Sequence, residues 1–478
     1  MLYYLLDWLN DLYDLPGFGV FRYITFRAIL SIIFSLIISV LIGKKLIDLL
    51  RKNLIGEVVR SKDIGPDHAS KAGTPTMGGL IILASILIPT LLWGDLRNGY
   101  VWLILLGTAW MGVIGFVDDY IKVFKKDKAG LKGKFKLAGQ LGLGLIVAGT
   151  MLFHPDFMGR RAHLTALNRV ETNAVLESVG FRNADELIGI NGAKYVSPPD
   201  GDEYANIASY TVRRIVRQAN GGRRFEKQKI EVTAESRKLI ASELFGPRDR
   251  SFIYTTDFPF FKEYVFNYSK VFFLDRIIDP AILGRIVYLL VVLFIVTAVS
   301  NAVNLTDGID GLAAGTTAIV GAGLGVFAYV SGNQVFASYL NISYIPLSAE
   351  LLVYVAALVG GCLGFLWYNS YPAQVFMGDT GSLALGGAIG ILSLMVKKEL
   401  LIPILCGVFF AETLSVIIQV SYFRYTRKKY GEGRRIFRMA PLHHHYEKVG
   451  IHESKITMRF FLVAVMLVLI AFATLKLR

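Results

Sequence analysis

Apolar residues fall into ten long runs that are separated by polar connections. Each run holds about 17–25 residues, which is long enough to cross a bilayer as an α-helix. We expect membrane spans at 24–46, 77–93, 101–121, 136–153, 285–303, 311–331, 350–369, 381–397, 400–423 and 457–476. The pattern predicts an all-α polytopic membrane protein whose spans lie in two parts of the chain, spans 1–4 in 1–153 and spans 5–10 in 284–478.

Residues 154–283 interrupt this pattern because they are polar and mixed in character. Alternating polar and apolar positions in 227–232 predict a strand, whereas the spacing in 205–218 and 234–245 predicts amphipathic helices. We therefore expect a small mixed α/β domain inserted between spans 4 and 5, with no role that the sequence assigns.

Basic residues gather in the loops that follow odd-numbered spans, at 51–71, 122–136 and 427–455. The positive-inside rule places these loops in the cytoplasm, and therefore both termini and the insert outside. Lys397 and Lys398, between spans 8 and 9, are an exception to this distribution. The basic residues of the insert are not, because long loops are translocated regardless of their charge.

The composition agrees with a membrane protein. Hydrophobic residues make up 54% of the chain and charged residues 18%, which excludes a disordered chain and an ordinary soluble enzyme. The net charge of +14 is explained by cytoplasmic loops, so no nucleic-acid partner is expected. Cys362 and Cys406 lie within apolar runs and indicate neither a disulfide framework nor a cysteine zinc site.

Two polar clusters adjoin the first spans on the predicted cytoplasmic side. A glycine-rich segment containing Lys71 and Thr76 leads into span 2, where a helix N-terminus favours an anion, although a simple helix start explains it equally well. Asp118 and Asp119 end span 3, where both the membrane and the helix dipole disfavour negative charge. Such acids need hydration, metal or cationic partners, and a solvated cap paired with Lys122 is the alternative.

Two further clusters follow spans 5 and 7. Asn304, Asp307 and Asp310 are spaced by three residues and share a helix face, with a hydrated turn as the alternative. In the second cluster Asn369 and Phe376 suit a nucleobase, and Asp379 before a Gly-Ser helix start suits a metal that bridges phosphates; core packing of the phenyl ring is the alternative.

The fifth cluster is the run of three histidines at 443–445, between spans 9 and 10. Consecutive residues of a helix do not face one ligand, so a three-histidine zinc site is not expected. A histidine-rich loop near phosphates would supply donors, whereas a solvated loop is the alternative.

All five clusters follow odd-numbered spans and are therefore expected to meet at one side of the membrane. Carboxylates with asparagine and glycine, flanked by lysines, are typical of Mg²⁺-dependent phosphoryl chemistry. This inventory of residues fits a hydrolase and a transferase equally well.

The clusters resemble the motifs of the polyprenyl-phosphate N-acetylhexosamine-1-phosphate transferases. The matching segments, in order, are Lys-x-Gly-Thr-Pro-Thr-Met-Gly-Gly at 71–79, Phe-x-Asp-Asp-Tyr at 116–120, Asn-Leu-Thr-Asp-Gly-x-Asp-Gly at 304–311, Phe-Met-Gly-Asp-x-Gly-Ser at 376–382 and Pro-Leu-His-His-His-x-Glu at 441–447. The last segment is typical of members that use UDP-MurNAc-pentapeptide and argues against a sister enzyme that uses UDP-GlcNAc.

The resemblance implies that phospho-MurNAc-pentapeptide passes from UDP-MurNAc-pentapeptide to undecaprenyl phosphate with Mg²⁺, giving lipid I and UMP. It also implies a homodimer in the bacterial inner membrane. The family has a short segment where this chain has its insert, so we expect the insert to be dispensable for catalysis. A lipid or nucleotide-sugar transporter is the other class considered, but it would place polar groups near the middle of the spans rather than at their ends.

The resemblance also assigns roles to single residues. It implies that Asp379 binds Mg²⁺, with Asn304 as a second ligand, and that Asp118 is the candidate base. Because a phosphate monoester has a second pKa of about 6, the acceptor is mostly dianionic at neutral pH, and Asp118 is instead expected to orient Mg²⁺ or Lys122. The implied catalytic residues are Asp118, Asp119, Asp379, His444 and His445. The implied substrate-binding residues are Lys71, Thr76, Lys122, Lys134, Asp307, Asp310, Asn369, Phe376, Gly378 and His443.

Overall fold

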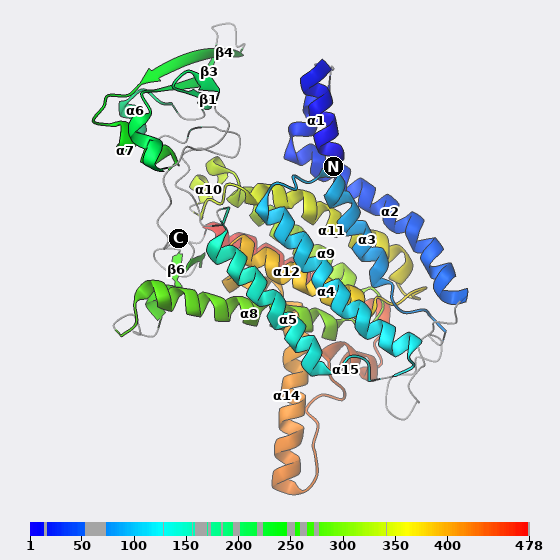
Figure 1. Cartoon of the computed structure of the whole chain (residues 1–478). Helices are drawn as coiled ribbons and strands as arrows, with labels where there is room; N and C mark the ends of the chain where they lie inside the picture. Colours follow the sequence, from blue (N-terminus) through cyan, green and yellow to red (C-terminus); the bar gives the residue numbers. More distant parts are fainter. Residues whose placement is uncertain are drawn as a thin grey trace. The chain divides into compact units, whose positions relative to one another are not determined.

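The computed structural model (Figure 1) consists of two compact units. The larger unit comprises Met1–Gly149, Thr256–Ile278 and Ile282–Arg478, and the smaller unit comprises Thr150–Thr255 and Asp279–Ala281. The residues that the structure describes are 1–13, 17–52, 73–127, 129–154, 156–157, 170, 174–182, 185–194, 201–217, 223–245, 254–258, 265–271, 277–340 and 342–476.

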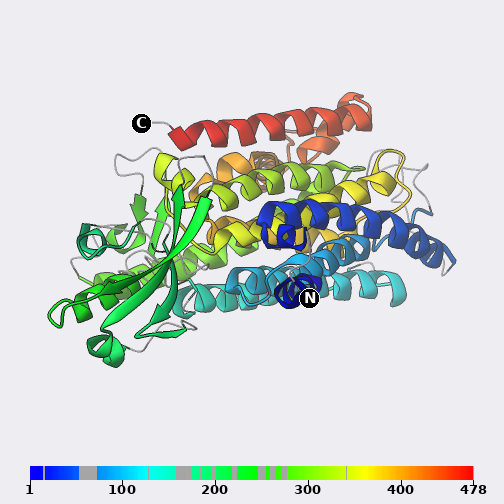
Figure 2. The ribbon, with the colours of Figure 1, turned by 90° about the horizontal axis from the view of Figure 1, so that it is seen from above.

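Eight helices within these described ranges are long and apolar enough to cross a membrane. They are α2 (Ile24–Lys52), α4 (Gly99–Phe124), α5 (Gly133–Phe153), α8 (Pro280–Thr306), α9 (Leu312–Ser331), α11 (Leu351–Asn369, preceded by the turn η6, Ser348–Glu350), α12 (Gly378–Met395) and α16 (Glu453–Ala473). Figure 2 shows α2 and α16 lying lengthwise along the larger unit, with the chain running in opposite directions in the two helices.

The two remaining predicted spans are less regular. The run 77–93 forms α3 (Gly79–Trp93), an apolar helix of only 15 residues with Pro89 inside it. The run 400–423 is broken: η7 (Glu399–Leu401) and α13 (Ile402–Leu405) are bent by 79° from α14 (Gly407–Tyr430). A helix therefore stands at each predicted span, and the prediction of an all-α polytopic membrane protein with a small mixed insert is confirmed.

The core of the larger unit is built around α11 and α12. Helix α11 packs against α2, α3 and α9, whereas α12 packs against α3, α4 and α9. Both central helices are rich in glycine and alanine, which lets the backbones of neighbouring helices approach closely in the absence of bulky side chains. The shorter helices α1 (Leu2–Tyr13), α10 (Gln334–Leu340) and α15 (Leu442–Val449) connect or flank the long ones.

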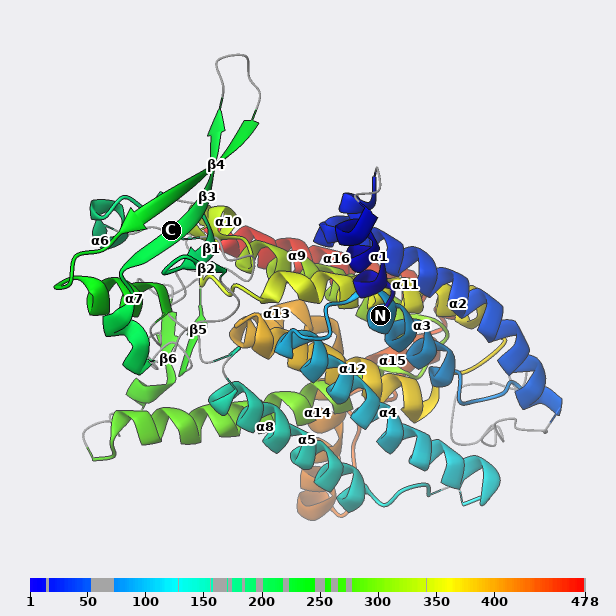
Figure 3. The ribbon, with the colours of Figure 1, turned by 45° about the horizontal axis from the view of Figure 1, so that its top comes forward.

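The smaller unit contains an antiparallel four-stranded sheet in the order β2-β1-β3-β4. Figure 3 shows its long hairpin, β3 and β4, whose strands pair from Ser209 with Glu231 to Arg217 with Arg223. The elements are α6 (Ala174–Ser178), β1 (Glu186–Ile190), β2 (Ala193–Lys194), η3 (Gly201–Asn206), β3 (Ser209–Arg217), β4 (Arg223–Glu231) and α7 (Arg237–Phe245). A separate apolar core joins this sheet to α6 and α7.

The prediction of a helix over 205–218 was wrong, because most of this segment is strand β3. Tyr210, Val212 and Arg214 are buried on one side of the strand, whereas Arg213 between them is exposed. This alternation, together with β-branched residues, favours a strand, and pairing with β1 and β4 completes it. The predicted strand in 227–232 and the helix in 234–245 correspond to β4 and α7.

Residues 256–278 belong to the larger unit although they fall inside the predicted insert, 154–283. Two short strands, β5 (Thr255–Asp257) and β6 (Val265–Asn267), pair with each other there. Asp257 forms an ion pair with the buried Lys398, and Tyr268 donates a hydrogen bond of 2.9 Å to Glu399. These contacts attach the segment to the connection between α12 and α13.

Candidate active site

The candidate site lies where the end of α4 meets the start of α12. Asp118 and Asp119 belong to the last two turns of α4, and Asp379 is the second residue of α12. The two helices touch at Gly115, where a Cβ atom would lie 2.1 Å from the carbonyl oxygen of Asp379. A residue with a side chain at this position would therefore push the three carboxylates apart.

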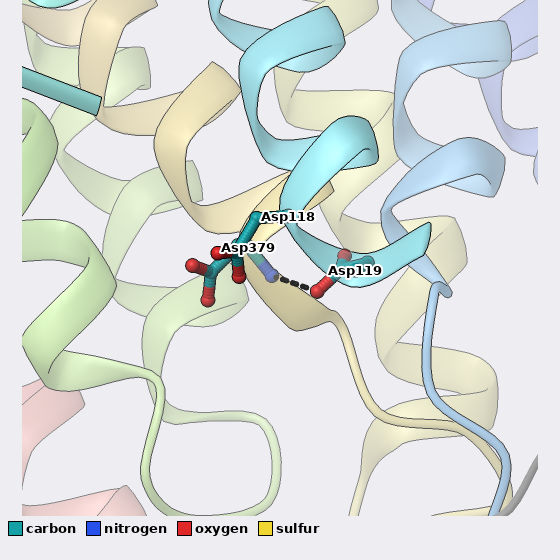
Figure 4. A group of neighbouring side chains, drawn as sticks. All are labelled: Asp118, Asp119 and Asp379. Atoms are coloured by element: carbon teal, nitrogen blue, oxygen red, sulfur yellow. Dashed lines mark hydrogen bonds between the residues drawn. The ribbon is translucent and has the colours of Figure 1, made fainter. Parts of the chain in front are cut away.

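Figure 4 shows the carboxylates of Asp118 and Asp379 beside each other, with Asp119 joined to the backbone N–H of Asp379. Each offers an oxygen atom that lies within 4.8 Å of the corresponding oxygen of the other two. Asp118 and Asp119 are buried, whereas Asp379 is partly exposed. Like charges this close in a protein interior repel one another strongly, so the arrangement requires cations.

Two lysines supply part of that positive charge. Lys122 lies 2.5 Å from Asp118 Oδ2 and 3.4 Å from Asp379 Oδ1. Lys136, at the start of α5, lies 2.9 Å from Asp118 Oδ1 and 2.5 Å from Asp379 Oδ2. The backbone N–H of Leu131 also donates to Asp118 Oδ1 at 2.7 Å, so this carboxylate holds both lysines and the loop between α4 and α5.

Asp119 has a different set of partners because it lies at the N-terminus of α12. Its carboxylate accepts hydrogen bonds from the backbone N–H of Asp379 (3.1 Å) and of Thr380 (2.9 Å), and from the Thr380 hydroxyl (2.6 Å). Gly378 approaches it with a φ of 73°, and a Cβ there would lie 2.6 Å from Asp119 Oδ2. The position thus requires glycine, both for its backbone conformation and for space.

Asn304, at the end of α8, extends the cluster. Its side-chain N–H groups donate to Asp379 Oδ1 at 3.1 Å and to Ser382 Oγ at 2.8 Å. Three carboxylates next to an amide side chain provide the oxygen donors that Mg²⁺ prefers. The three negative charges of the carboxylates also outnumber the two positive charges of the lysines, so the donor set fits a divalent cation.

The motifs predicted to bind the nucleotide, at 71–79 and 376–382, are hydrogen-bonded to each other. The backbone segment before α3 pairs with the one before α12, since Phe376 N–H donates to Pro75 O and Gly78 N–H to Phe376 O, both at 2.8 Å. Thr76 lies between these contacts and is partly exposed. Asn369 accepts from Gly311 N–H at 3.0 Å.

Asp310 belongs to the same hydrogen-bonded region. Its carboxylate accepts from Ala373 N–H at 3.0 Å, and its own backbone N–H donates to Glu453 at 2.6 Å. Asp310 and Asn369 are both buried, whereas Asp307 and Phe376 remain partly exposed.

The three histidines begin α15 and have separate partners. His443 is fully buried, and its Nδ1 lies 3.1 Å from the carboxylate of Glu412 on α14. His444 Nδ1 lies 2.6 Å from Glu447, and His445 Nδ1 accepts the backbone N–H of Arg438 at 3.1 Å. His444 and His445 are partly exposed, so their rings have surface available to a ligand, whereas that of His443 has none in this structure.

Comparison with known proteins adds independent evidence. A model for glycosyl transferase family 4 matches residues 261–397, and a phospho-N-acetylmuramoyl-pentapeptide-transferase signature matches residues 71–83. The chain is 48% identical to the phospho-N-acetylmuramoyl-pentapeptide-transferase of Flavobacterium psychrophilum, 46% to that of Flavobacterium johnsoniae and 44% to that of Salinibacter ruber. Each of these alignments covers 100% of both chains.

The chain belongs to the phospho-N-acetylmuramoyl-pentapeptide transferases. The membership confirms the resemblance on which the sequence analysis relied. As a member of this family, the chain is a multi-pass membrane enzyme, a phosphoglycosyl transferase of peptidoglycan synthesis.

The relatives also correct one expectation about these transferases. The insert was expected to be a departure from the family, but the alignments to the relatives from Flavobacterium and Salinibacter run over 480 residues and cover both chains completely. These phospho-N-acetylmuramoyl-pentapeptide transferases are therefore of the same length, so the insert is shared within this group.

Not every residue assigned from the transferase motifs lies in the cluster. The structure brings together Asp118, Asp119, Asp379, Lys122, Asn304 and Gly378. Lys71 lies outside the described residues. Lys134 is exposed, and its ammonium group lies over the ring of Phe135, 5.2 Å from the ring centroid.

Sequence reasoning missed Lys136 as a site residue of the transferase. A signal for it existed in the spacing of α5, because Lys136, Gln140, Leu143 and Val147 share the inward face, and the last three are buried. Lys134 is two positions away and points to another face.

Proposed function

We propose that the protein transfers phospho-MurNAc-pentapeptide from UDP-MurNAc-pentapeptide to undecaprenyl phosphate in a Mg²⁺-dependent reaction that yields lipid I and UMP. The observation that carries the proposal is the group of three carboxylates and two lysines at the junction of α4, α5 and α12. This group combines donors for a divalent cation with ammonium groups for phosphate oxygens.

The chemistry divides among the residues as follows. An oxygen of the acceptor phosphate attacks the phosphorus that is bonded to the sugar, and the bond from that phosphorus to the bridging oxygen breaks, releasing UMP. Bound Mg²⁺, held by Asp379 with Asp118, Asp119 and Asn304 around it, would neutralise pyrophosphate charge. Lys122 and Lys136 exchange their carboxylate partners for phosphate oxygens and stabilise the charge of the transition state.

Asp118 suits the task of holding both lysines better than that of a base. Its carboxylate is fully buried and already contacts Lys122, Lys136 and the N–H of Leu131. An acceptor phosphate that is mostly dianionic at neutral pH needs no base to remove a proton.

We propose that the site faces the cytoplasm and that the insert lies on the opposite side of the membrane. The lysine- and arginine-rich connections support this orientation by the positive-inside rule. Lys397 and Lys398 depart from this rule, but Lys398 is buried and paired with Asp257, so it does not act as a free charge in a loop.

Release of UMP by the purified protein tests the proposed function. We expect release only when UDP-MurNAc-pentapeptide, undecaprenyl phosphate and Mg²⁺ are all present, together with formation of a lipid-linked product. Release without the lipid would indicate a hydrolase, and release from UDP-GlcNAc instead would indicate the sister transferase. Either result would contradict the proposal.

A further inference from the structure

Helix α14 carries a buried polar face that the reaction outlined above does not use. Glu412, Gln419 and Thr426 are spaced by seven residues, which is close to two helical turns, so they lie on one side of the helix. Their exposed fractions are 0%, 9% and 1%, whereas apolar neighbours such as Leu414 and Ile417 are more than half exposed. Buried polar groups in proteins are held by hydrogen bonds, so this face must have a partner.

The partner is the segment that returns along α14 toward the three histidines, 434–443. In Figure 1 the outer part of α14 extends beyond the neighbouring helices, and this segment runs back alongside it. Thr426 Oγ1 accepts the N–H of Arg434 at 2.8 Å. Gln419 Oε1 accepts the N–H groups of Ile436 and Phe437, both at 3.0 Å, and its Nε2 donates to Phe437 O at 3.0 Å.

Glu412 forms the last contact of this series. Its carboxylate accepts the backbone N–H of His443 at 3.2 Å and lies 3.1 Å from His443 Nδ1. Both side chains are fully buried, so removing the carboxylate leaves the backbone N–H of His443 without its acceptor. Glu412 thus determines where α15 begins.

On its other side His443 contacts the loop that follows α8. A Cβ atom on Gly308 would lie 2.2 Å from His443 Nε2, so the imidazole rests directly on that glycine. Gly308 lies between Asp307 and Asp310 of the Asn-Leu-Thr-Asp-Gly-x-Asp-Gly motif. The Glu412–His443 pair therefore joins α14 to a loop of the candidate site.

The position of α15 also determines what its two partly exposed histidines offer. His445 Nδ1 accepts a backbone N–H, so in the neutral ring the proton is on Nε2, which is a donor. His444 Nδ1 faces the carboxylate of Glu447 and donates to it, so in the neutral ring Nε2 is an acceptor. The free nitrogen of one ring thus donates and that of the other accepts. Each ring can bind its part of a ligand only if α15 is held in the right position.

We propose that the face of Glu412, Gln419 and Thr426 positions the histidine helix for phosphoryl transfer, with Glu412 as the main positioning residue. The inference rests on the proposed function for its catalytic readout. It adds that α14, which itself contacts neither phosphate, affects the rate of transfer through the position of α15.

The principal variant is Glu412→Gln, which keeps the shape of the side chain and removes its charge. We expect kcat to fall about 10-fold, because the charge-assisted hydrogen bond to the N–H of His443 becomes a neutral one, while KM for UDP-MurNAc-pentapeptide changes little. Ser415→Ala is the matched control: Ser415 is equally buried on α14, but its hydroxyl bonds the carbonyl oxygen of Glu412 and not the returning segment. We expect Ser415→Ala to retain wild-type kcat, and Glu412→Asp to recover part of the loss.

Hydrogen exchange provides a readout that is independent of activity. In the full-length protein without substrates, Glu412→Gln should raise amide exchange over 434–449 and leave α12 unchanged. If the wild type fails to release UMP, the proposed function fails, while this exchange pattern still tests the positioning face. Should Glu412→Gln not fold, Gln419→Leu and Thr426→Val are to give smaller losses of kcat and the same local exchange.

Two results would overturn the proposal. One is a kcat for Glu412→Gln, or for the Gln419→Leu and Thr426→Val pair, equal to that of Ser415→Ala. The other is increased exchange spread over the whole protein rather than confined to 434–449.

Discussion

Each unit of the molecule contains a buried aspartate with cationic partners. The two surroundings differ in whether the negative and positive charges cancel. In the smaller unit Asp185 pairs with Arg214 through contacts of 2.7 and 2.5 Å, and the two charges cancel. In the larger unit Asp118 and Asp379 share two lysines, and a third carboxylate, that of Asp119, lies close by with only N–H and O–H donors as partners. A balanced pair holds a fold together, whereas an excess of buried negative charge is costly unless a further cation binds. The difference supports the proposal that the larger unit carries the chemistry.

The strongest test of this contrast removes one carboxylate from each unit. Asp379→Asn should lower transfer about 1,000-fold, because it takes away the proposed donor for Mg²⁺ and a partner of both lysines. Asp185→Asn should leave kcat unchanged, although it weakens the hold on Arg214. UMP release measures the first effect, and amide exchange in β3 and β4 measures the second. Equal loss of transfer in both variants would remove the distinction between the units.

The two lysines of α5 sharpen the contrast within the larger unit. Lys136→Met should reduce kcat about 100-fold, because Lys136 contacts both Asp118 and Asp379. Lys134→Met should have little effect, since this side chain is exposed and apart from the carboxylates. Steady-state kinetics of the two variants, side by side, decide the matter. A larger loss in Lys134→Met would contradict the geometry of α5.

Asp118→Asn tests whether this buried carboxylate is a base or a support for the lysines. A support is needed at every pH, so the loss of kcat should be constant from about pH 6, near the second pKa of the acceptor phosphate, to more alkaline pH. A base is not needed once the phosphate is fully dianionic, so activity that recovers at alkaline pH would show that proton removal is its role. The pH–rate profiles of wild type and variant give the answer.

Deletions define the boundary between the units. Removing 160–250 with a short linker should preserve transfer in detergent, because the proposed catalytic residues all belong to the larger unit. Extending the deletion to 275 also removes Asp257 and Tyr268, and the buried Lys398 and Glu399 lose these partners at a cost of roughly 3–5 kcal/mol. We expect less folded protein by size-exclusion chromatography for the longer deletion. Equal yield and activity from both would contradict the assignment of 256–278.

The helical part of the fold could be predicted because a long apolar run has few alternatives in a bilayer. The strand at 209–217 could not, since Arg213 and Arg214 are adjacent and only the pairing with β1 and β4 shows which of them is buried. In the site, the aspartates were recognisable because acids at the ends of membrane helices are unfavourable without partners. Lys136 was not, because the choice among three nearby lysines depends on the rotation of α5.

Glu412 could have been singled out from the sequence, although its partner could not. It is a single acid within the apolar run 400–423, and an ionisable residue inside a span is by itself a reason to look for a partner. Its partner, His443, is 31 residues further along the chain. The bend before α14 and the return of the segment bring the two together, and neither is encoded in a local pattern.

Helix α12 is held at both of its ends. At the first, Asp119 receives the N–H groups of Asp379 and Thr380; beyond the last, the carbonyl oxygen of Lys397 accepts from Thr256 and Asp257. Every residue from Thr380 to Met395 is buried. Helix α12 therefore holds Asp379 in a fixed position. When the proposed substrates bind, we expect the surrounding loops and the substrates themselves, rather than α12, to move so that the two phosphates meet.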